Sequence, residues 1–83
     1  MMVNNSKTSA SHLSDVPVGG DARVISVTGD ARMSRRLMEM GVVPGVSVRV
    51  VKAAPFGDPI EIRVRGYNLA MRKRDAQGIE VSM

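Results

Sequence analysis

Proline and glycine interrupt this chain at short intervals, and these interruptions constrain its fold more than any other feature. The turn residues cluster at 17–20, 44–45 and 55–59. Proline fixes φ and lacks an N–H donor, while glycine permits positive φ, so both tend to end regular elements. The segments between the clusters are short and rich in Val and Ile, which favours short strands.

The chain has 83 residues and no cysteine. This length suits one small domain, which buries only ~60% of the surface of its unfolded form, so a large catalytic cleft is not expected. Without cysteine there is no disulfide framework and no thiolate metal site, a composition that fits a reducing, intracellular location.

The N-terminal segment 1–12 is polar and is predicted to be a disordered tail, because its Asn, Ser, Thr and Lys side chains offer nothing to bury. It lacks the apolar centre of a secretory signal. Nowhere does an apolar run reach the ~20 residues that a bilayer-spanning helix needs. We therefore predict an ordered domain over 13–83 in a cytoplasmic protein.

Apolar alternation and β-branched runs predict five short strands. They cover 22–28, 46–53, 60–65, 68–72 and 79–81. Strands that each carry one apolar face close most simply into a small barrel, because closure removes exposed edges. The predicted fold class is therefore mainly β, a small barrel of about five strands with one short helix between strands 1 and 2.

The predicted helix covers 31–40. Met33, Leu37 and Met40 recur on one face of a 3.6-residue period, which indicates that this face packs against the core. Asp30 can cap the first turn by accepting a hydrogen bond from a free backbone N–H.

The third and fourth strands are predicted to form a hairpin. The Gly-Tyr pair at 66–67 fits a type II′ turn, which takes glycine first. This turn would place Val64 opposite Leu69 on the apolar face. On the other face it would place Glu61 opposite Arg72, an opposite-charge pair worth ~0.2–1 kcal/mol.

Residues that could carry catalysis or bind a metal are scarce. His12 is the only histidine and lies in the predicted tail, so it anchors no Ser-His-Asp arrangement. A glycine-rich phosphate loop is lacking, and the carboxylates are scattered. Asp58, between Gly57 and Pro59, is typical of a turn residue rather than a general base. We therefore predict a protein that is not an enzyme and that has no cofactor and no metal site.

The surplus of positive charge opens a second function class, a small basic nucleic-acid-binding barrel. Lys and Arg number 12 against 8 Asp and Glu, and they cluster at 32–36, 63–65 and 72–74. Phe56 and Tyr67 are the only aromatic residues on which bases could stack, so we expect no nucleic-acid partner. This class would require micromolar binding to DNA or RNA with a steep salt dependence.

Three segments, in their order and spacing, resemble the FeoA family, small cytosolic proteins of bacterial ferrous-iron transport. They are the helix and its exit at 36–45 (RLMEMGVVPG), the loop at 54–60 (APFGDPI) and the hairpin at 64–72 (VRGYNLAMR). The resemblance covers 13–83. It implies an SH3-like β-barrel with no established catalytic activity.

The resemblance also implies a partner, the membrane transporter FeoB, which moves Fe²⁺ and carries a cytosolic GTP-binding domain. The chain would be its accessory or regulator and would meet the membrane only through it. A related barrel forms the C-terminal domain of metal-dependent repressors, so a stand-alone relative of that domain is an alternative. A direct Fe²⁺ carrier ranks last, because the predicted barrel holds neither Cys nor His.

We predict a docking surface for this partner at the rigid bends and on the outer side of the helix. Loops rich in Pro and Gly lose little entropy on docking, and arginines steer an acidic partner. Met38 lies off the apolar face of the helix and would supply an adaptable apolar contact. The predicted partner-binding residues are Arg35, Arg36, Met38, Gly41, Val43, Pro44, Pro55, Phe56 and Asp58.

Overall fold

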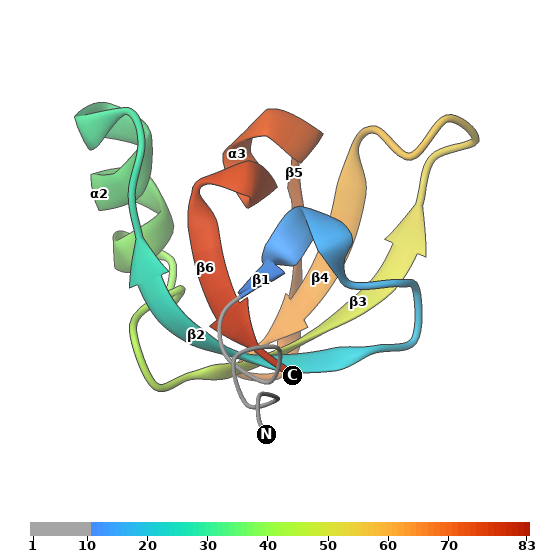
Figure 1. The fold of residues 1–83 in the computed structure, drawn as a ribbon, viewed down its shortest axis with the longest axis horizontal. Coiled ribbons are helices and arrows are strands. Elements are labelled where there is room, and N and C mark those ends of the chain that lie inside the picture. Colours follow the sequence, from blue (N-terminus) through green and yellow to red (C-terminus); the bar gives the residue numbers. More distant parts are fainter. Residues whose placement is uncertain (1–10) are drawn as a thin grey trace, which may run out of the picture.

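The computed structural model describes residues 11–83, which form one curled antiparallel sheet with short helices at its margins (Figure 1). In chain order the elements are β1 (Ser11–His12), η1 (Leu13–Asp15, a 3-10 helix), β2 (Asp21–Val27), α2 (Ala31–Glu39), β3 (Ser47–Ala53), β4 (Ile60–Val64), β5 (Tyr67–Met71), α3 (Lys73–Gln77) and β6 (Ile79–Ser82). The strand order is β1-β6-β2-β3-β4-β5, so β1 and β5 are the two edges. The mainly β prediction, with one helix between the first two predicted strands, is confirmed.

The structure has six strands where the sequence predicts five, because two residues of the predicted tail are ordered. Ser11 and His12 pair with Val81 and Glu80 at the margin of the sheet. Neither side chain is buried, so main-chain pairing with β6 and not apolar periodicity holds this strand. The remainder of the predicted tail, 1–10, lies outside the described residues.

The interior of the curled sheet is entirely apolar. Its largest fully buried side chains come from η1, from four strands and from the exit of α2; they are Leu13, Val24, Val42, Val50, Ile62, Val64, Ile79 and Val81. Between residues 11 and 83 no polar or charged residue is buried.

Helix α2 forms as the sequence predicts. The Asp30 side chain accepts hydrogen bonds from two backbone N–H groups of the first turn, at 2.8 and 3.3 Å. Leu37 is buried, while Met33 and Met40 are half-buried against the core. Gly41 has a φ of 99°, the left-handed conformation that ends a helix at low steric cost.

The β4–β5 hairpin is present, but the predicted turn and register are wrong. Its turn residues are 65–66, with φ of 53° and 88°, and Val64 pairs with Tyr67. Positive φ at both positions defines a type I′ turn, whose twist matches that of the strands. An arginine in this conformation costs ~1–2 kcal/mol, so the sequence favours the glycine-first turn. The pairing slides by two residues: the same faces stay inward, and Glu61 lies opposite Ala70.

Candidate docking surface

The segment that leaves α2 is tied to the middle of the sheet. The backbone N–H of Gly45 donates to the Val24 carbonyl at 2.7 Å, and the Val24 N–H donates to the Val46 carbonyl at 2.9 Å. Within this segment Val43 is half-buried and Pro44 is exposed. The exit of the helix is therefore a firmly held bend that faces solvent.

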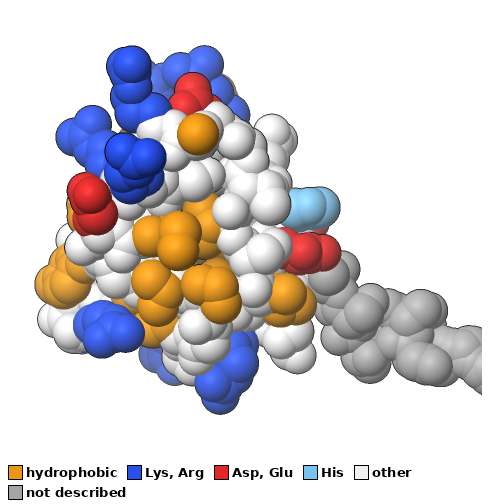
Figure 2. All heavy atoms as spheres, turned by 90° about the vertical axis from the view of Figure 1, so that its left-hand side faces the viewer, with side chains coloured by type: hydrophobic (Ala, Val, Ile, Leu, Met, Phe, Trp, Pro, Cys, Tyr) orange, Lys and Arg blue, Asp and Glu red, His pale blue; other side chains and the backbone are white. Residues whose placement is uncertain are grey.

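Exposed apolar side chains lie on both segments that meet at this bend. Met38 on α2 and Ile25 on β2 are each 43% exposed. Ile25 follows Val24, the residue that bonds the bend, at an irregularity in the pairing of β2 with β6. Figure 2 shows apolar side chains gathered in the middle of this face, with Lys and Arg side chains above and below them. The prediction of an exposed Met38 is confirmed.

The β4–β5 hairpin also reaches the exit of α2. A side chain placed on Gly41 would begin 3.2 Å from Cδ of Arg65 and 3.4 Å from the hydroxyl oxygen of Tyr67. Sequence reasoning missed both residues and Ile25. A signal existed only for Ile25, because in a strand two adjacent β-branched residues cannot both face the core.

We call this face the exit surface. The name covers residues that are exposed or half-buried and that belong to α2, to its exit or to the β2 and hairpin segments that meet this exit: Ile25, Arg35, Arg36, Met38, Gly41, Val43, Pro44, Arg65 and Tyr67. The guanidinium groups of Arg35 and Arg36 form no ion pair with any carboxylate of the described domain. The arrangement is an apolar centre with cationic margins, which suits an acidic protein partner.

The remaining predicted residues lie elsewhere. Pro55, Phe56 and Asp58 belong to the β3–β4 loop, at the opposite end of the molecule from α2 (Figure 1). Phe56 is 95% exposed. The Asp58 carboxylate accepts a hydrogen bond from the Lys73 N–H at 3.0 Å, so it caps α3 instead of its own turn. The structure thus splits the predicted residues between two separate places.

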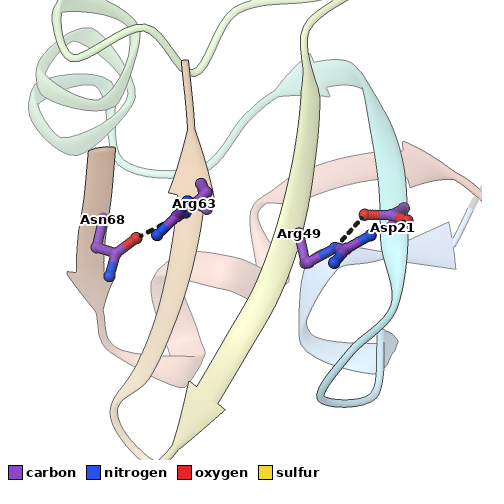
Figure 3. Close-up of polar contacts among 4 residues, drawn as sticks. All are labelled: Asp21, Arg49, Arg63 and Asn68. Atoms are coloured by element: carbon purple, nitrogen blue, oxygen red, sulfur yellow. Dashed lines mark hydrogen bonds and ion pairs between the residues drawn. The ribbon is translucent and has the colours of Figure 1, made fainter. Parts of the chain in front are cut away.

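Several charged side chains on the outer face of the sheet form side-chain hydrogen bonds with their neighbours on adjacent strands. Figure 3 shows Asn68, Arg63, Arg49 and Asp21 in one row across four strands. Arg49 donates to the two carboxylate oxygens of Asp21 at 2.7 and 3.0 Å, and Arg63 donates to the Asn68 amide oxygen at 3.2 Å. Arg49 and Arg63 face each other in the register, a repulsive pairing that these neighbours offset.

The hydrogen bonds from Arg49 lower the pKa of the Asp21 carboxyl below its ordinary value. Because the folded pKa is the lower one, the pair stabilises the fold above the ordinary pKa, and this small contribution is lost as pH falls through the folded value. We expect Arg49→Gln to raise the pKa of Asp21 towards its ordinary value in an NMR titration. An unchanged pKa would mean that the ion pair does not form in solution.

Two features are absent from the described domain. No helix within residues 11–83 is long and apolar enough to cross a bilayer. The same residues contain no group of three or more His, Cys, Asp or Glu side chains placed to hold a metal ion.

Comparisons with known proteins place the chain in a family. The FeoA domain family matches residues 11–83. A fusion protein of Fe(2+) transport protein A and the Fe(2+) transporter FeoB from Porphyromonas gingivalis is 38% identical over 71 residues. This match covers 86% of the chain but only 8% of the relative's length.

Solved structures agree in fold. The FeoA protein of Chlorobium tepidum is 41% identical with a TM-score of 0.84, over 88% of this chain and 70% of that one. FeoA of Stenotrophomonas maltophilia, solved with zinc and described as an SH3 domain protein, is 33% identical with a TM-score of 0.77, over 87% and 89% of the chains. A manganese-dependent transcriptional repressor, 22% identical with a TM-score of 0.79 over 88% and 41% of the chains, shares the fold alone. The fold is SH3-like, and the chain belongs to the FeoA domain family, which is associated with ferrous-iron transport.

Proposed function

We propose that this chain is a non-catalytic, cytoplasmic accessory protein that binds the cytosolic part of a FeoB-type transporter. The observation that carries the proposal is the fusion of a similar sequence to FeoB in the Porphyromonas gingivalis relative. Two domains joined in one polypeptide are held at a high effective concentration, which promotes contact between them. A fusion of this kind therefore supports the idea that the two domains act together. On this reading the chain supplies contacts and regulation, while the transporter with its GTP-binding domain moves the iron.

The exit surface is the proposed site of docking. Its apolar centre at Met38 and Ile25 offers area to bury, and methionine adapts to an irregular partner. Arg35 and Arg36 at its margin steer an acidic surface and raise the association rate. Because Gly45 and Val46 tie the bend to β2, the bend loses little conformational entropy on binding.

The β3–β4 loop is proposed as a second, separate contact. Phe56 is almost fully exposed, and an aromatic side chain that finds a pocket on a partner contributes strongly to binding. In this proposal Pro55 and Phe56 touch the partner, and Asp58 acts indirectly by fixing the loop on α3.

Charge reversal and loss of the apolar contact on α2 test the main site. We expect Arg35→Glu with Met38→Asp to weaken binding to the purified cytosolic region of the transporter at least ~10-fold, because steering and apolar burial are lost together. Titration calorimetry at two salt concentrations measures the change, and the native affinity should itself fall with salt.

Arg63→Glu is the matched control, because it reverses an arginine on the outer face of the sheet, away from α2. It should bind like the native chain. Equal affinity of the double variant and the control would refute the exit surface as the docking site.

A further inference from the structure

A groove of about 470 Å³ separates α2 from β5 and α3. Its α2 wall is formed by Met33, Leu37 and Met40, and Leu69 and Met71 of β5 form the other wall. The volume falls within the roughly 300–1,000 Å³ typical of ligand pockets. The exit surface uses none of these five side chains.

The groove runs along the free edge of β5. Leu69, Ala70 and Met71 are consecutive, and all three line it. Successive side chains of a strand point to opposite faces, so a hollow that touches three in a row lies at the edge and not on one face. β5 is the last strand of the sheet, with β4 on one side and no strand on the other.

Unpaired backbone groups are available at this edge. In the two-residue hairpin Val64 and Tyr67 flank the turn, and hydrogen-bonded and non-hydrogen-bonded pairs alternate from there. The alternation turns the N–H and C=O groups of Asn68 and Ala70 away from β4, to the open side of β5, where Ala70 lines the groove. Neither residue's backbone takes part in a hydrogen bond outside the sheet.

The rim of the groove carries more positive than negative charge. Arg36 and Arg72 line it from opposite sides, and neither forms an ion pair within residues 11–83. The one carboxylate in the lining, Asp75, accepts a hydrogen bond from the Arg72 N–H at 3.3 Å. An occupant that carries carboxylates would complement these arginines.

We propose that this groove binds an extended acidic peptide segment, which adds to β5 as a further antiparallel or parallel strand. Main-chain hydrogen bonds to Asn68 and Ala70 give affinity, alternate apolar side chains enter the space between Leu37 and Leu69, and carboxylates meet Arg36 and Arg72. The site shares Arg36 with the exit surface but uses different apolar side chains, and it does not depend on the identity of the transporter. It gives the domain a second binding activity, for unfolded acidic segments.

Blocked seven-residue peptides test the proposal, one alternating valine and glutamate and the other alternating valine and lysine. We expect NMR titration of the ¹⁵N-labelled chain to show binding of the glutamate peptide, with slowed amide exchange at Asn68 and Ala70. The lysine peptide should bind at least ~10-fold more weakly, because it places cations beside Arg36 and Arg72. Equal affinity for both peptides, or no slowed exchange at these two amides, would overturn the proposal.

Ala70→Pro removes the outward N–H and places a ring on the edge, a substitution that an edge strand tolerates when the N–H faces solvent. Circular dichroism checks its fold, and binding of the glutamate peptide should be lost. Arg72→Glu keeps the backbone intact and should weaken binding at least ~10-fold. A folded Ala70→Pro chain that binds normally would contradict edge pairing, and normal binding by Arg72→Glu would contradict the charge assignment.

Two further measurements separate this site from its alternatives. The double variant Arg35→Glu with Met38→Asp should bind the glutamate peptide normally, so failure of the proposed transporter contact leaves this test intact. Sedimentation equilibrium compares the native chain with the Ala70→Pro variant. We expect no self-association of the native chain that is lost in this variant. Such self-association would mean that a second copy of β5 occupies the edge, which overturns the peptide assignment.

Discussion

The substitution Ile62→Ala is expected to remove a large fraction of the stability of the domain. Ile62 is fully buried in β4, where it pairs with Val50 of β3 and Leu69 of β5. Removing this side chain loses its burial and leaves a cavity, which together cost about 2–5 kcal/mol. Small domains have a total stability near the lower end of ~5–15 kcal/mol, so the loss is a large fraction of it. Urea denaturation followed by circular dichroism measures the change.

Ile25→Ala is the matched control, since it makes the same chemical change at a side chain that is 43% exposed. We expect its free energy of unfolding to stay within about 1 kcal/mol of the native value. The same variant should weaken transporter binding if Ile25 belongs to the docking centre. Equal destabilisation by the two variants would contradict the assignment of Ile62 to the core.

Local patterns were sufficient to predict the elements that carry their own signal. The apolar period of Met33, Leu37 and Met40 and the cap at Asp30 predicted α2, and alternation predicted the strands. These signals depend on neighbours within one or two turns of the chain, so the sequence contains them completely. The pairing of Ser11 and His12 has no such signal, because backbone hydrogen bonds to β6 hold it.

The hairpin register shows a second limit of sequence reasoning. A residue with unfavourable intrinsic conformation, Arg65, occupies the left-handed position because the type I′ turn fits the twist of the two strands. The matching twist stabilises every residue pair of the hairpin, whereas the cost of the left-handed conformation falls on Arg65 alone. The alternation of apolar residues therefore predicts correctly which side chains face the core. The conformational preference of one turn residue predicts the wrong turn.

The candidate site was predicted only where its residues are close in sequence. Arg35, Met38 and Pro44 could be grouped because one helix and its exit carry them. Two features arise from the way the sheet curls: the approach of Tyr67 to Gly41, and the separation of the β3–β4 loop from α2 (Figure 1). Long-range proximity of this kind leaves no periodic pattern in one sequence, so the sequence could not show that the predicted partner-binding residues lie at two separate places.

The second large effect is expected at Gly78, where two segments distant in sequence touch. A Cβ on this residue would lie 2.6 Å from the Thr28 carbonyl oxygen, a backbone atom that cannot turn aside. Its φ of −87° is open to any residue, so the conflict is one of space and not of conformation. The Gly78 carbonyl also accepts hydrogen bonds from the Thr28 N–H at 2.6 Å and from its hydroxyl at 3.1 Å.

Gly78→Ala must therefore push the end of β2 away from the start of β6, weakening both hydrogen bonds, and overpacking of this kind costs about 1–3 kcal/mol. Gln77→Ala is the control, because its side chain is exposed and only a few tenths of a kcal/mol should change. Chemical denaturation compares the two, and similar stabilities would show that the segments can separate freely. Since Thr28 lies just before the cap residue Asp30, the displacement also moves α2, and Gly78→Ala should lower transporter affinity without touching the docking surface.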